Sequence, residues 1–406
     1  MFPINVYVMI KGCIRACLII VNHVYFLTYL IWVLILYPLR IFGCSGLFNK
    51  IEGEMMLGLI KMITMWNEWA GYEVLEAGDD ITPCLEERSL VLVNHQSPGD
   101  VIILFSAFIG WHQILPNVMW IMDHFIKYST VGIVSSIRKD FFIFQGRAMR
   151  NESLKALAEH IRNFYLPLKR KWLILFPEGG LLCKRKKNSQ KYGKLNNLPH
   201  LELVTIPRVG ALKVIMNELK GEVPDSSLIG NHEVTHELKY ILDVTIGYPK
   251  GKPLSLLSII FGDAPPCKIV IYYRLFPIDE IPLDDEVMKE WLLSKWVEKE
   301  KLLAEFYDTG EFPLKPNSVA PRPIIPGYTA INCSNSAKKS FLIKHFPKDH
   351  LRRKQWMINM NRHNWRPTDY SCFWEKHGKK RVDRKRASKP TAIPTIFAHK
   401  ERNRFL

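Results

Sequence analysis

The feature that most constrains this chain is a stretch of 24 residues without a charged side chain, from Ala16 to Leu39. At 1.5 Å per residue a helix over this stretch is about 36 Å long, enough to cross a hydrocarbon core of roughly 30 Å. The apolar core of a cleaved signal peptide is shorter, about 7 to 15 residues. We therefore predict an uncleaved transmembrane anchor over residues 16–39, with a long buried helix as the alternative.

A second apolar segment follows, from Met55 to Trp69. It carries Lys61 and Glu68, and it is too short and too charged to cross a membrane. A segment of this kind is typical of a helix that lies in the membrane interface. We therefore predict that residues 1–70 form an N-terminal membrane anchor.

The positive charge of the chain is concentrated at its C-terminal end. Residues 321–406 hold 21 basic and five acidic side chains, whereas residues 1–320 hold 35 and 34. Broad nucleic-acid binding needs basic residues spread over a surface, so the first 320 residues are not expected to bind nucleic acid. Three tryptophans lie among the basic residues of the tail, a mixture that suits acidic lipid headgroups or RNA: Trp356, Trp365 and Trp374. Charge runs are usually solvated, and we predict a disordered basic tail over residues 331–406.

Short β-type segments alternate with helical segments between residues 71 and 312. The expected strands lie at residues 90–93, 172–176, 203–206, 244–246 and 269–273. Apolar residues recur at helical spacing after Asn151 and again after Asp284, and each of these two residues can cap a helix. This alternation predicts an α/β domain with a mixed, largely parallel sheet flanked by helices. A proline-rich linker is predicted at residues 313–330.

A histidine and an aspartate follow the first of the expected body strands. His95 comes two residues after that strand, a Pro98-Gly99 turn follows, and Asp100 opens the next helix. In α/β sheets, ligands bind at the carboxyl ends of strands. Across the turn the carboxylate can hold the imidazole in one tautomer and stabilise its charged form. The pair therefore predicts a general base that acts on a hydroxyl group.

Two further segments carry residues suited to a phosphorylated ligand. The strand at 172–176 runs into Pro177, Glu178, Gly179 and Gly180, where glycine allows a ligand to approach the backbone. Four consecutive basic residues follow near this strand end: Lys184, Arg185, Lys186 and Lys187. Upstream, Arg147 follows an apolar run, and its guanidinium can grip a phosphate at two points.

Four blocks in this order resemble the glycerolipid acyltransferases of the 1-acylglycerol-3-phosphate acyltransferase superfamily. They are the His95 and Asp100 pair, the block that ends at Arg147, the block from Phe176 to Gly179, and the expected strand followed by Pro207 and Arg208. The segment from Trp291 to Pro313, with Tyr248-Pro249 upstream, is similar to the branch of lysophosphatidylglycerol and lysocardiolipin acyltransferases. One block alone is a weak signal, but four in order are specific.

The resemblance implies an acyl-CoA-dependent lysophospholipid acyltransferase of the endoplasmic reticulum membrane. It assigns His95 as the base and Asp100 as the residue that orients it. It further implies that Arg147 binds the acceptor phosphate and that the acceptor site is shaped by Glu178, Gly179, Pro207 and Arg208. Acyl-CoA is then a co-substrate, and neither a metal nor another cofactor is expected.

Two other functions remain as alternatives. His232, Glu233 and His236 match the H-E-x-x-H pattern of zinc proteases, although a metzincin would need glycine and histidine where Lys239 and Leu242 stand. A membrane scaffold that kept the fold and lost its activity is the third possibility. The presence of all four acyltransferase blocks argues against a scaffold.

Overall fold

A computed structural model describes residues 6–324, except for residues 112–113, 145, 147, 220–237, 283 and 315–317, together with residues 343–345 and 372–374. The chain divides into two units, residues 1–324 and 325–406. In the second unit two short strands, β9 (Ile343–His345) and β10 (Cys372–Trp374), pair in antiparallel fashion. The rest of the predicted disordered tail lies outside the described residues.

The first unit is built on an eight-stranded sheet with the strand order β4-β3-β5-β2-β6-β7-β1-β8. The strands are β1 (Tyr72–Gly78), β2 (Ser89–Val93), β3 (Val118–Asp123), β4 (Phe141–Ile143), β5 (Trp172–Leu175), β6 (Tyr240–Gly247), β7 (Cys267–Pro277) and β8 (Val319–Pro323). The pairings β6 with β7 and β1 with β8 are antiparallel, and the other five are parallel. The predicted mixed, largely parallel α/β fold is confirmed.

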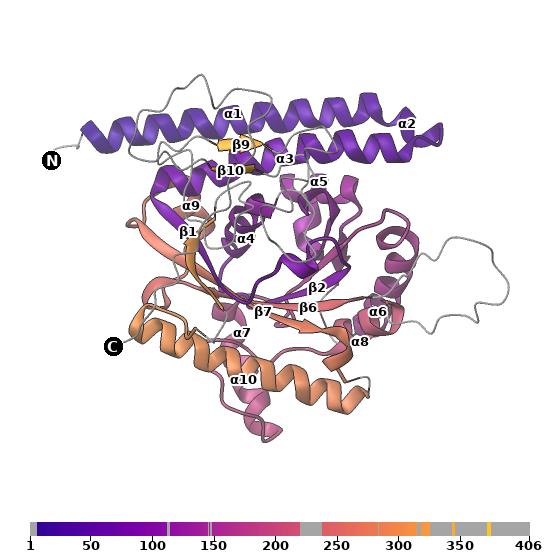
Figure 1. Cartoon of the computed structure of the whole chain (residues 1–406), viewed down its shortest axis with the longest axis vertical. Helices are drawn as coiled ribbons and strands as arrows, with labels where there is room; N and C mark the ends of the chain where they lie inside the picture. The colour runs from indigo at the N-terminus through magenta and orange to yellow at the C-terminus, as the bar shows by residue number, and fades with distance from the viewer. Residues whose placement is uncertain are drawn as a thin grey trace, which may run out of the picture. The chain divides into compact units, whose positions relative to one another are not determined.

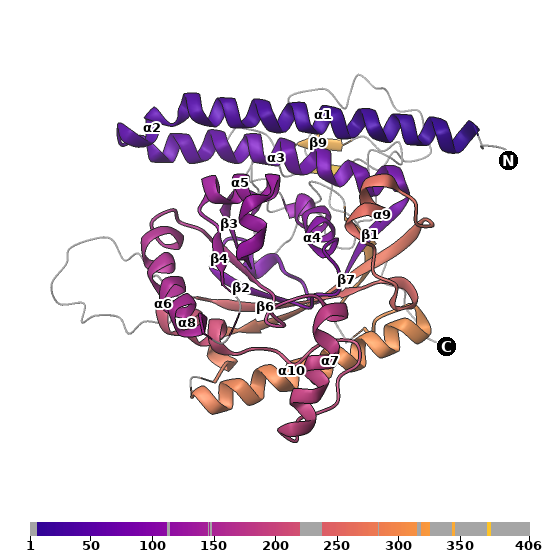
Figure 2. The same cartoon turned by 180° about the vertical axis from the view of Figure 1, so that it is seen from behind.

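Helices cover both faces of this sheet (Figures 1 and 2). On one face lie α4 (Asp100–Phe108) and α5 (Thr130–Arg138), and on the other lie α6 (Arg150–His160), α8 (Gly210–Leu219) and α10 (Asp285–Thr309). Strand β2 shows why two cores form: Val91 and Val93 join the core under α4, whereas Leu90 and Leu92 join the core over α8 and α10. Successive side chains of a strand point to opposite faces, so a strand buried on both sides reads as a continuous apolar run.

The remaining short elements connect these layers. They are α7 (Leu182–Leu195), α9 (Leu256–Phe261), a π-helical turn (Ile161–Tyr165) and the 3-10 turns Thr82–Cys84, Ile109–Trp111, Leu115–Asn117, His124–Tyr128, Pro249–Gly251 and Ile278–Glu280. Of these, α7 leaves the sheet on the face opposite to α4 (Figures 1 and 2).

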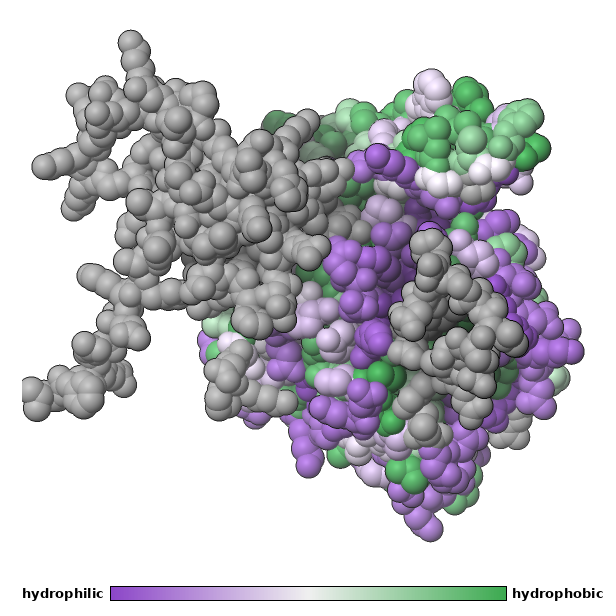
Figure 3. Space-filling model, turned by 45° about the vertical axis from the view of Figure 1, so that its right-hand side comes forward, coloured by the Kyte–Doolittle hydropathy of each residue, from purple (hydrophilic) through white to green (hydrophobic). Residues whose placement is uncertain are grey.

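The N-terminal segment forms a helical hairpin of α1 (Val6–Leu36), the short α2 (Pro38–Ile41) and α3 (Ser45–Ala70). One side of α1 packs on α3, with Tyr29 and Val33 buried against Phe48 and Leu59. The other side exposes large apolar residues: Ile20, Val21, Val24, Leu27, Ile31, Leu34 and Ile35. The segment Gly12–Ile41 is long and apolar enough to cross a membrane. The hydrophobic surface of the hairpin stands out from the more polar body in Figure 3.

A buried carboxylate fastens this hairpin to the body. The Tyr29 hydroxyl donates a hydrogen bond to Glu52 Oε1 at 2.7 Å, and Arg138 Nη1 donates to both oxygens of Glu52 at 2.7 Å. These three residues come from α1, α3 and α5, respectively. Helix α3 also begins ten residues before the expected interfacial helix at 55–69, because its N-terminal half pairs with α1.

Three sequence expectations differ from the structure. Residues 203–206 form no strand, since their amides bond to two carboxylates: Glu300 accepts from Leu203 and Val204, and Glu178 accepts from Thr205.

Helix α6 has Met149 at its N-cap, so Asn151 lies in the first turn. Part of the predicted linker forms β8, an edge strand on β1, and edge strands tolerate proline. Asp284 caps α10 as predicted, accepting from the amides of Glu286 and Val287 at 3.0 Å.

Candidate active site

His95 lies at the carboxyl edge of the sheet, two residues beyond β2. Strands β5 and β6 flank β2 and run parallel to it, so the loops that follow these three strands meet at one edge. Both backbone groups of His95 are held: its N–H donates to Glu178 Oε1 at 3.0 Å, and its carbonyl accepts from the Leu182 amide at 2.8 Å. Its side chain is 18% exposed. The imidazole is therefore fixed in place while a substrate can still reach it.

Asp100 contacts this imidazole through one oxygen of its carboxylate. His95 Nδ1 lies 2.9 Å from Asp100 Oδ2, and the carboxylate is fully buried. The same oxygen accepts from the amides of Gln96 and Ser97 at 2.7 and 2.9 Å. The other oxygen accepts from the Tyr248 hydroxyl at 2.6 Å. An ionised carboxylate only accepts, so Nδ1 carries the proton and Nε2 is the free base.

Gly99 is required at the turn that brings the two side chains together. A Cβ atom at this position would lie 2.6 Å from the Leu254 carbonyl oxygen and 2.8 Å from Ile259 Cδ1. The Ser97 hydroxyl fixes the same turn by donating to the Leu254 carbonyl and accepting from the Gly99 amide. A larger residue at position 99 would therefore displace the start of α4, and Asp100 with it.

Glu178 lies beneath the site, and its carboxylate is buried. Its second oxygen accepts from both the amide and the hydroxyl of Thr205 at 2.9 Å. Burial raises the pKa of Glu178 to about 7, although the donors from Thr205 and His95 oppose this. The carboxylate thus joins the loops after β2 and β5 to the segment at 203–208. Each of the two Glu178 oxygens accepts at least one hydrogen bond from the protein.

Gly179 and Arg208 lie together at the rim of this edge. Gly179 has a φ of +65°, which favours glycine, and a Cβ atom there would lie 3.1 to 3.2 Å from the Arg208 guanidinium. The Arg208 amide, next to Pro207, donates to the Pro177 carbonyl at 2.8 Å. The structure therefore brings the third and fourth sequence blocks together beside His95.

Arg147 and the H-E-x-x-H segment at His232 to His236 lie outside the described residues. The strand before Arg147, β4, is parallel to β3, and β3 is parallel to β5. The carboxyl ends of β4 and β3 thus lie on the same edge as His95. There His124 stacks on Phe144 with ring centroids 3.8 Å apart.

Sequence reasoning assigned no site role to two tyrosines. Tyr248 follows β6 and bonds to Asp100, and the Tyr307 hydroxyl accepts from Gln96 Nε2 at 2.7 Å. Tyr248 appeared in the sequence only as part of a branch signature. Its role depends on the order of the strands, which puts β6 beside β2.

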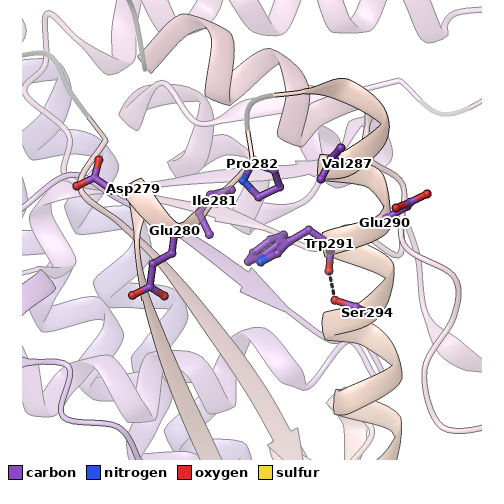
Figure 4. A pocket seen from close by; sticks show the side chains of 8 residues that line it. All are labelled: Asp279, Glu280, Ile281, Pro282, Val287, Glu290, Trp291 and Ser294. Atoms are coloured by element: carbon purple, nitrogen blue, oxygen red, sulfur yellow. Dashed lines mark hydrogen bonds between the residues drawn. The ribbon is translucent and has the colours of Figure 1, made fainter.

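A groove of about 530 Å³ lies elsewhere, between the Ile278–Glu280 turn and the start of α10 (Figure 4). Its lining residues are Asp279, Glu280, Ile281, Pro282, Val287, Glu290, Trp291 and Ser294. None of the four sequence blocks contributes to it. Its three carboxylates also repel a phosphorylated substrate, so we do not assign it to the reaction.

Comparison with known proteins identifies the family of this chain. A family model described as Acyltransferase matches residues 70–209, and one described as Acyltransferase C-terminus matches residues 258–332. The chain is 40% identical over 313 residues to acyl-CoA:lysophosphatidylglycerol acyltransferase 1 of Homo sapiens. This alignment covers 76% of this chain and 84% of the human protein. It belongs to the glycerolipid acyltransferase family. The superfamily predicted from the four blocks and the branch predicted from the segment between Trp291 and Pro313 are confirmed, and the chain is an enzyme of the acyltransferase class.

More distant acyltransferases match a smaller part of the chain. Lysocardiolipin acyltransferase 1 of Gallus gallus is 24% identical over 242 residues, which covers 59% of each chain. A third family model, described as THAP domain, matches residues 328–397 of this acyltransferase. That match falls in the basic tail, which we predicted to be disordered from its charged residues. The charge of a segment does not by itself indicate whether it contains a domain.

Two variants of this acyltransferase separate the charge of Asp100 from its placement. In Asp100→Asn the amide oxygen can still accept the three hydrogen bonds that Oδ2 accepts from His95, Gln96 and Ser97. The new NH₂ group takes the place of Oδ1, and it can donate to the Tyr248 hydroxyl, which then accepts instead of donating. The shape of the site is then kept, but the charge that stabilises the imidazolium is lost. We expect kcat to fall by about 10³-fold at an unchanged unfolding temperature.

Tyr248→Phe keeps the charge and removes one of the four donors. Burial beside Asp100 raises the pKa of Tyr248 well above its usual range, so its hydroxyl stays protonated and donates throughout the working pH range. We expect kcat to fall about tenfold at an unchanged unfolding temperature, because the carboxylate that faces His95 is then less well held. A kcat within about twofold of the wild type in Tyr248→Phe would contradict this positioning role.

Proposed function

We propose that this enzyme transfers a fatty acyl group from acyl-CoA to a free hydroxyl of a lysophospholipid, with lysophosphatidylglycerol as the preferred acceptor. The observation that carries the proposal is the contact of 2.9 Å between His95 and the buried Asp100 at the open edge of the sheet. The name of the relative at 40% identity supports the acceptor. Residence in the endoplasmic reticulum membrane is proposed from the resemblance.

His95 acts as the base in the proposed reaction. The acceptor hydroxyl gives its proton to Nε2 of His95 while its oxygen attacks the thioester carbonyl carbon of acyl-CoA. The carbon–sulfur bond then breaks, and CoA leaves as the thiol when it takes the proton from His95. Asp100 stabilises the transient imidazolium through Nδ1. The chemistry is direct transfer, without a covalent intermediate on the enzyme.

The other site residues are proposed to hold this geometry and to bind the acceptor. Glu178 fixes the backbone of His95 from below, since its oxygens are occupied by protein donors. Gly179, Pro207 and Arg208 form the rim of the acceptor site, and Arg147 binds the acceptor phosphate. The apolar outer side of α1 gives the enzyme contact with the bilayer in which its lipid substrates are dissolved.

The test is the release of CoA by membranes that contain this chain, supplied with oleoyl-CoA and one lysophospholipid at a time. The panel contains lysophospholipids with glycerol, inositol, choline and ethanolamine headgroups, together with lysophosphatidic acid and lysocardiolipin. We expect acceptor-dependent release that is fastest with lysophosphatidylglycerol. Reactions without an acceptor and membranes without the chain are the blanks. Release no faster than the blanks would overturn the function, and a different best acceptor would overturn the headgroup assignment.

A further inference from the structure

Helix α7 carries a stripe of lysines that the reaction described above does not use. The helix contains six basic residues and no acidic one, and four of its lysines are exposed: Lys184, Lys187, Lys191 and Lys194. Their spacing of three, four and three residues puts them on one side of the helix. We call these four residues the lysine stripe.

The charges of the lysine stripe are not neutralised by the fold. Among the described residues none of the four lysines has an ion-pair partner, whereas Lys186, which lies outside the stripe, pairs with Glu202. Lysines three or four positions apart repel one another, and basic residues near a helix N-terminus also oppose the helix dipole. The stripe therefore concentrates positive charge, and an anionic ligand would relieve the repulsion.

The position of α7 ties this charge to the catalytic histidine. The amide of Leu182, the first residue of the helix, donates to the carbonyl of His95 at 2.8 Å. The lysine stripe starts two residues later and extends along the helix for about 15 Å. The helix leaves the sheet on the face opposite to the membrane hairpin of α1 and α3 (Figures 1 and 2). The stripe thus leads from the reacting centre toward water.

These features fit the polar half of the acyl donor. In acyl-CoA about 13 bonds separate the thioester sulfur from the diphosphate, an extended span of ~15 Å at the ~1.2 Å per bond typical of an extended chain. The diphosphate and the 3′-phosphate are anionic and soluble in water. With the thioester at His95, phosphates at this distance reach the far end of the lysine stripe.

We propose that the lysine stripe of α7 binds the phosphates of CoA and so holds the acyl donor with its thioester at His95. This inference rests on the proposed function. In this arrangement the polar half of acyl-CoA lies on the face of the sheet that carries α7. The acyl chains of the donor and of the lysophospholipid then lie on the side of the α1 and α3 hairpin. Lysine suits this role because its ammonium group pairs with phosphate without demanding one fixed geometry.

The test compares two donors that share the thioester and the pantetheine arm, oleoyl-CoA and oleoyl-pantetheine, by following the release of free thiol. Only oleoyl-CoA carries the phosphates, as part of its 3′-phosphoadenosine diphosphate group. The stripe variant is Lys187→Gln/Lys191→Gln/Lys194→Gln. The control variant Lys155→Gln/Lys268→Gln/Lys301→Gln removes the same charge from exposed positions outside α7. For the stripe variant we expect kcat/KM with oleoyl-CoA to fall about tenfold through KM, and kcat/KM with oleoyl-pantetheine to stay at the wild-type value. The control variant should match the wild type with both donors.

The possible outcomes separate this proposal from its alternatives. Equal losses with both donors would show that the lysines support the fold, and no loss with either would show a merely solvated helix face. Loss of binding to phosphatidylglycerol vesicles with unchanged donor kinetics would assign the lysine stripe to the membrane. Each of these three results overturns the proposal. A wild-type enzyme that releases thiol from neither donor would instead overturn the proposed function.

Discussion

A His95→Ala variant is expected to release CoA about 10³-fold more slowly than the wild type when both are offered oleoyl-CoA and the best acceptor. The substitution removes the only group in the described site that combines a free basic nitrogen with a buried carboxylate behind it. The backbone should stay in place, because Glu178 and Leu182 bond to the main chain of residue 95 and not to its side chain. The measurement is acceptor-dependent CoA release, with the thermal unfolding midpoint as the check on folding.

The matched control for this variant is His200→Ala. His200 also contacts a carboxylate, at 2.6 Å from Glu202, but the pair lies on the surface and the His200 side chain is 67% exposed. Removing it should leave CoA release within about twofold of the wild type, since exposed pairs contribute little. Activity in His95→Ala that matched His200→Ala, at equal protein amounts, would rule out His95 as the base.

The site contact that could be predicted from the sequence is a local one. His95 and Asp100 are five positions apart, and the Pro98-Gly99 turn between them can be recognised without any knowledge of the sheet. Tyr248 bonds to the same carboxylate from 148 positions away. Its place depends on β6 lying next to β2, and hydrophobic patterns do not specify strand order. The pattern thus predicted that His95 and Asp100 meet, but not the tyrosine that completes the hydrogen bonding of Asp100.

The wrong strand at residues 203–206 has a related cause. Its apolar and β-branched composition suits a strand, and Thr205 lies beside the loop that follows β5. Its amides nevertheless bond to the carboxylates of Glu178 and Glu300, which are distant in sequence. A backbone amide that is satisfied by a side chain is no longer available to a neighbouring strand. Composition predicts the tendency of such a segment but not the partner that its amides find.

Lys299 is a core residue whose partners, like those of residues 203–206, are distant in sequence. Its replacement gives the largest expected effect on stability. Lys299 lies between two glutamates in the sequence, a pattern typical of a solvated helix face. In the structure its side chain is fully buried, with Nζ 2.7 Å from Asp243 and 2.6 Å from the Val244 carbonyl. Arg274 completes the cluster with two bonds to Asp243, at 2.7 and 2.9 Å. The cluster fastens α10 to β6 and β7.

A Lys299→Met variant is expected to lose about 3–5 kcal/mol of unfolding free energy, because it leaves a buried carboxylate with one cation instead of two. Burial lowers the pKa of Lys299 to about 8, so at pH 7 the wild-type ammonium is charged. Burial alone would favour a neutral Asp243, but the charges of Lys299 and Arg274 outweigh it and lower the Asp243 pKa. Methionine keeps most of the side-chain volume, so the loss reports the charge rather than a cavity.

The measurement is the thermal unfolding midpoint of the membrane-extracted enzyme at pH 7, which should fall by roughly 4–8 °C, because an unfolding entropy of about 2.1 cal/mol/K per residue over a body of this size converts 1 kcal/mol into about 1.5 °C. Lys301→Met on the same helix is the control, since Lys301 is exposed and its replacement should change the unfolding free energy by less than about 0.5 kcal/mol. Equal midpoints for the two variants would show that Arg274 alone compensates Asp243. The double variant Lys299→Met/Asp243→Asn removes both charges, and it should recover part of the loss because no unbalanced buried carboxylate remains.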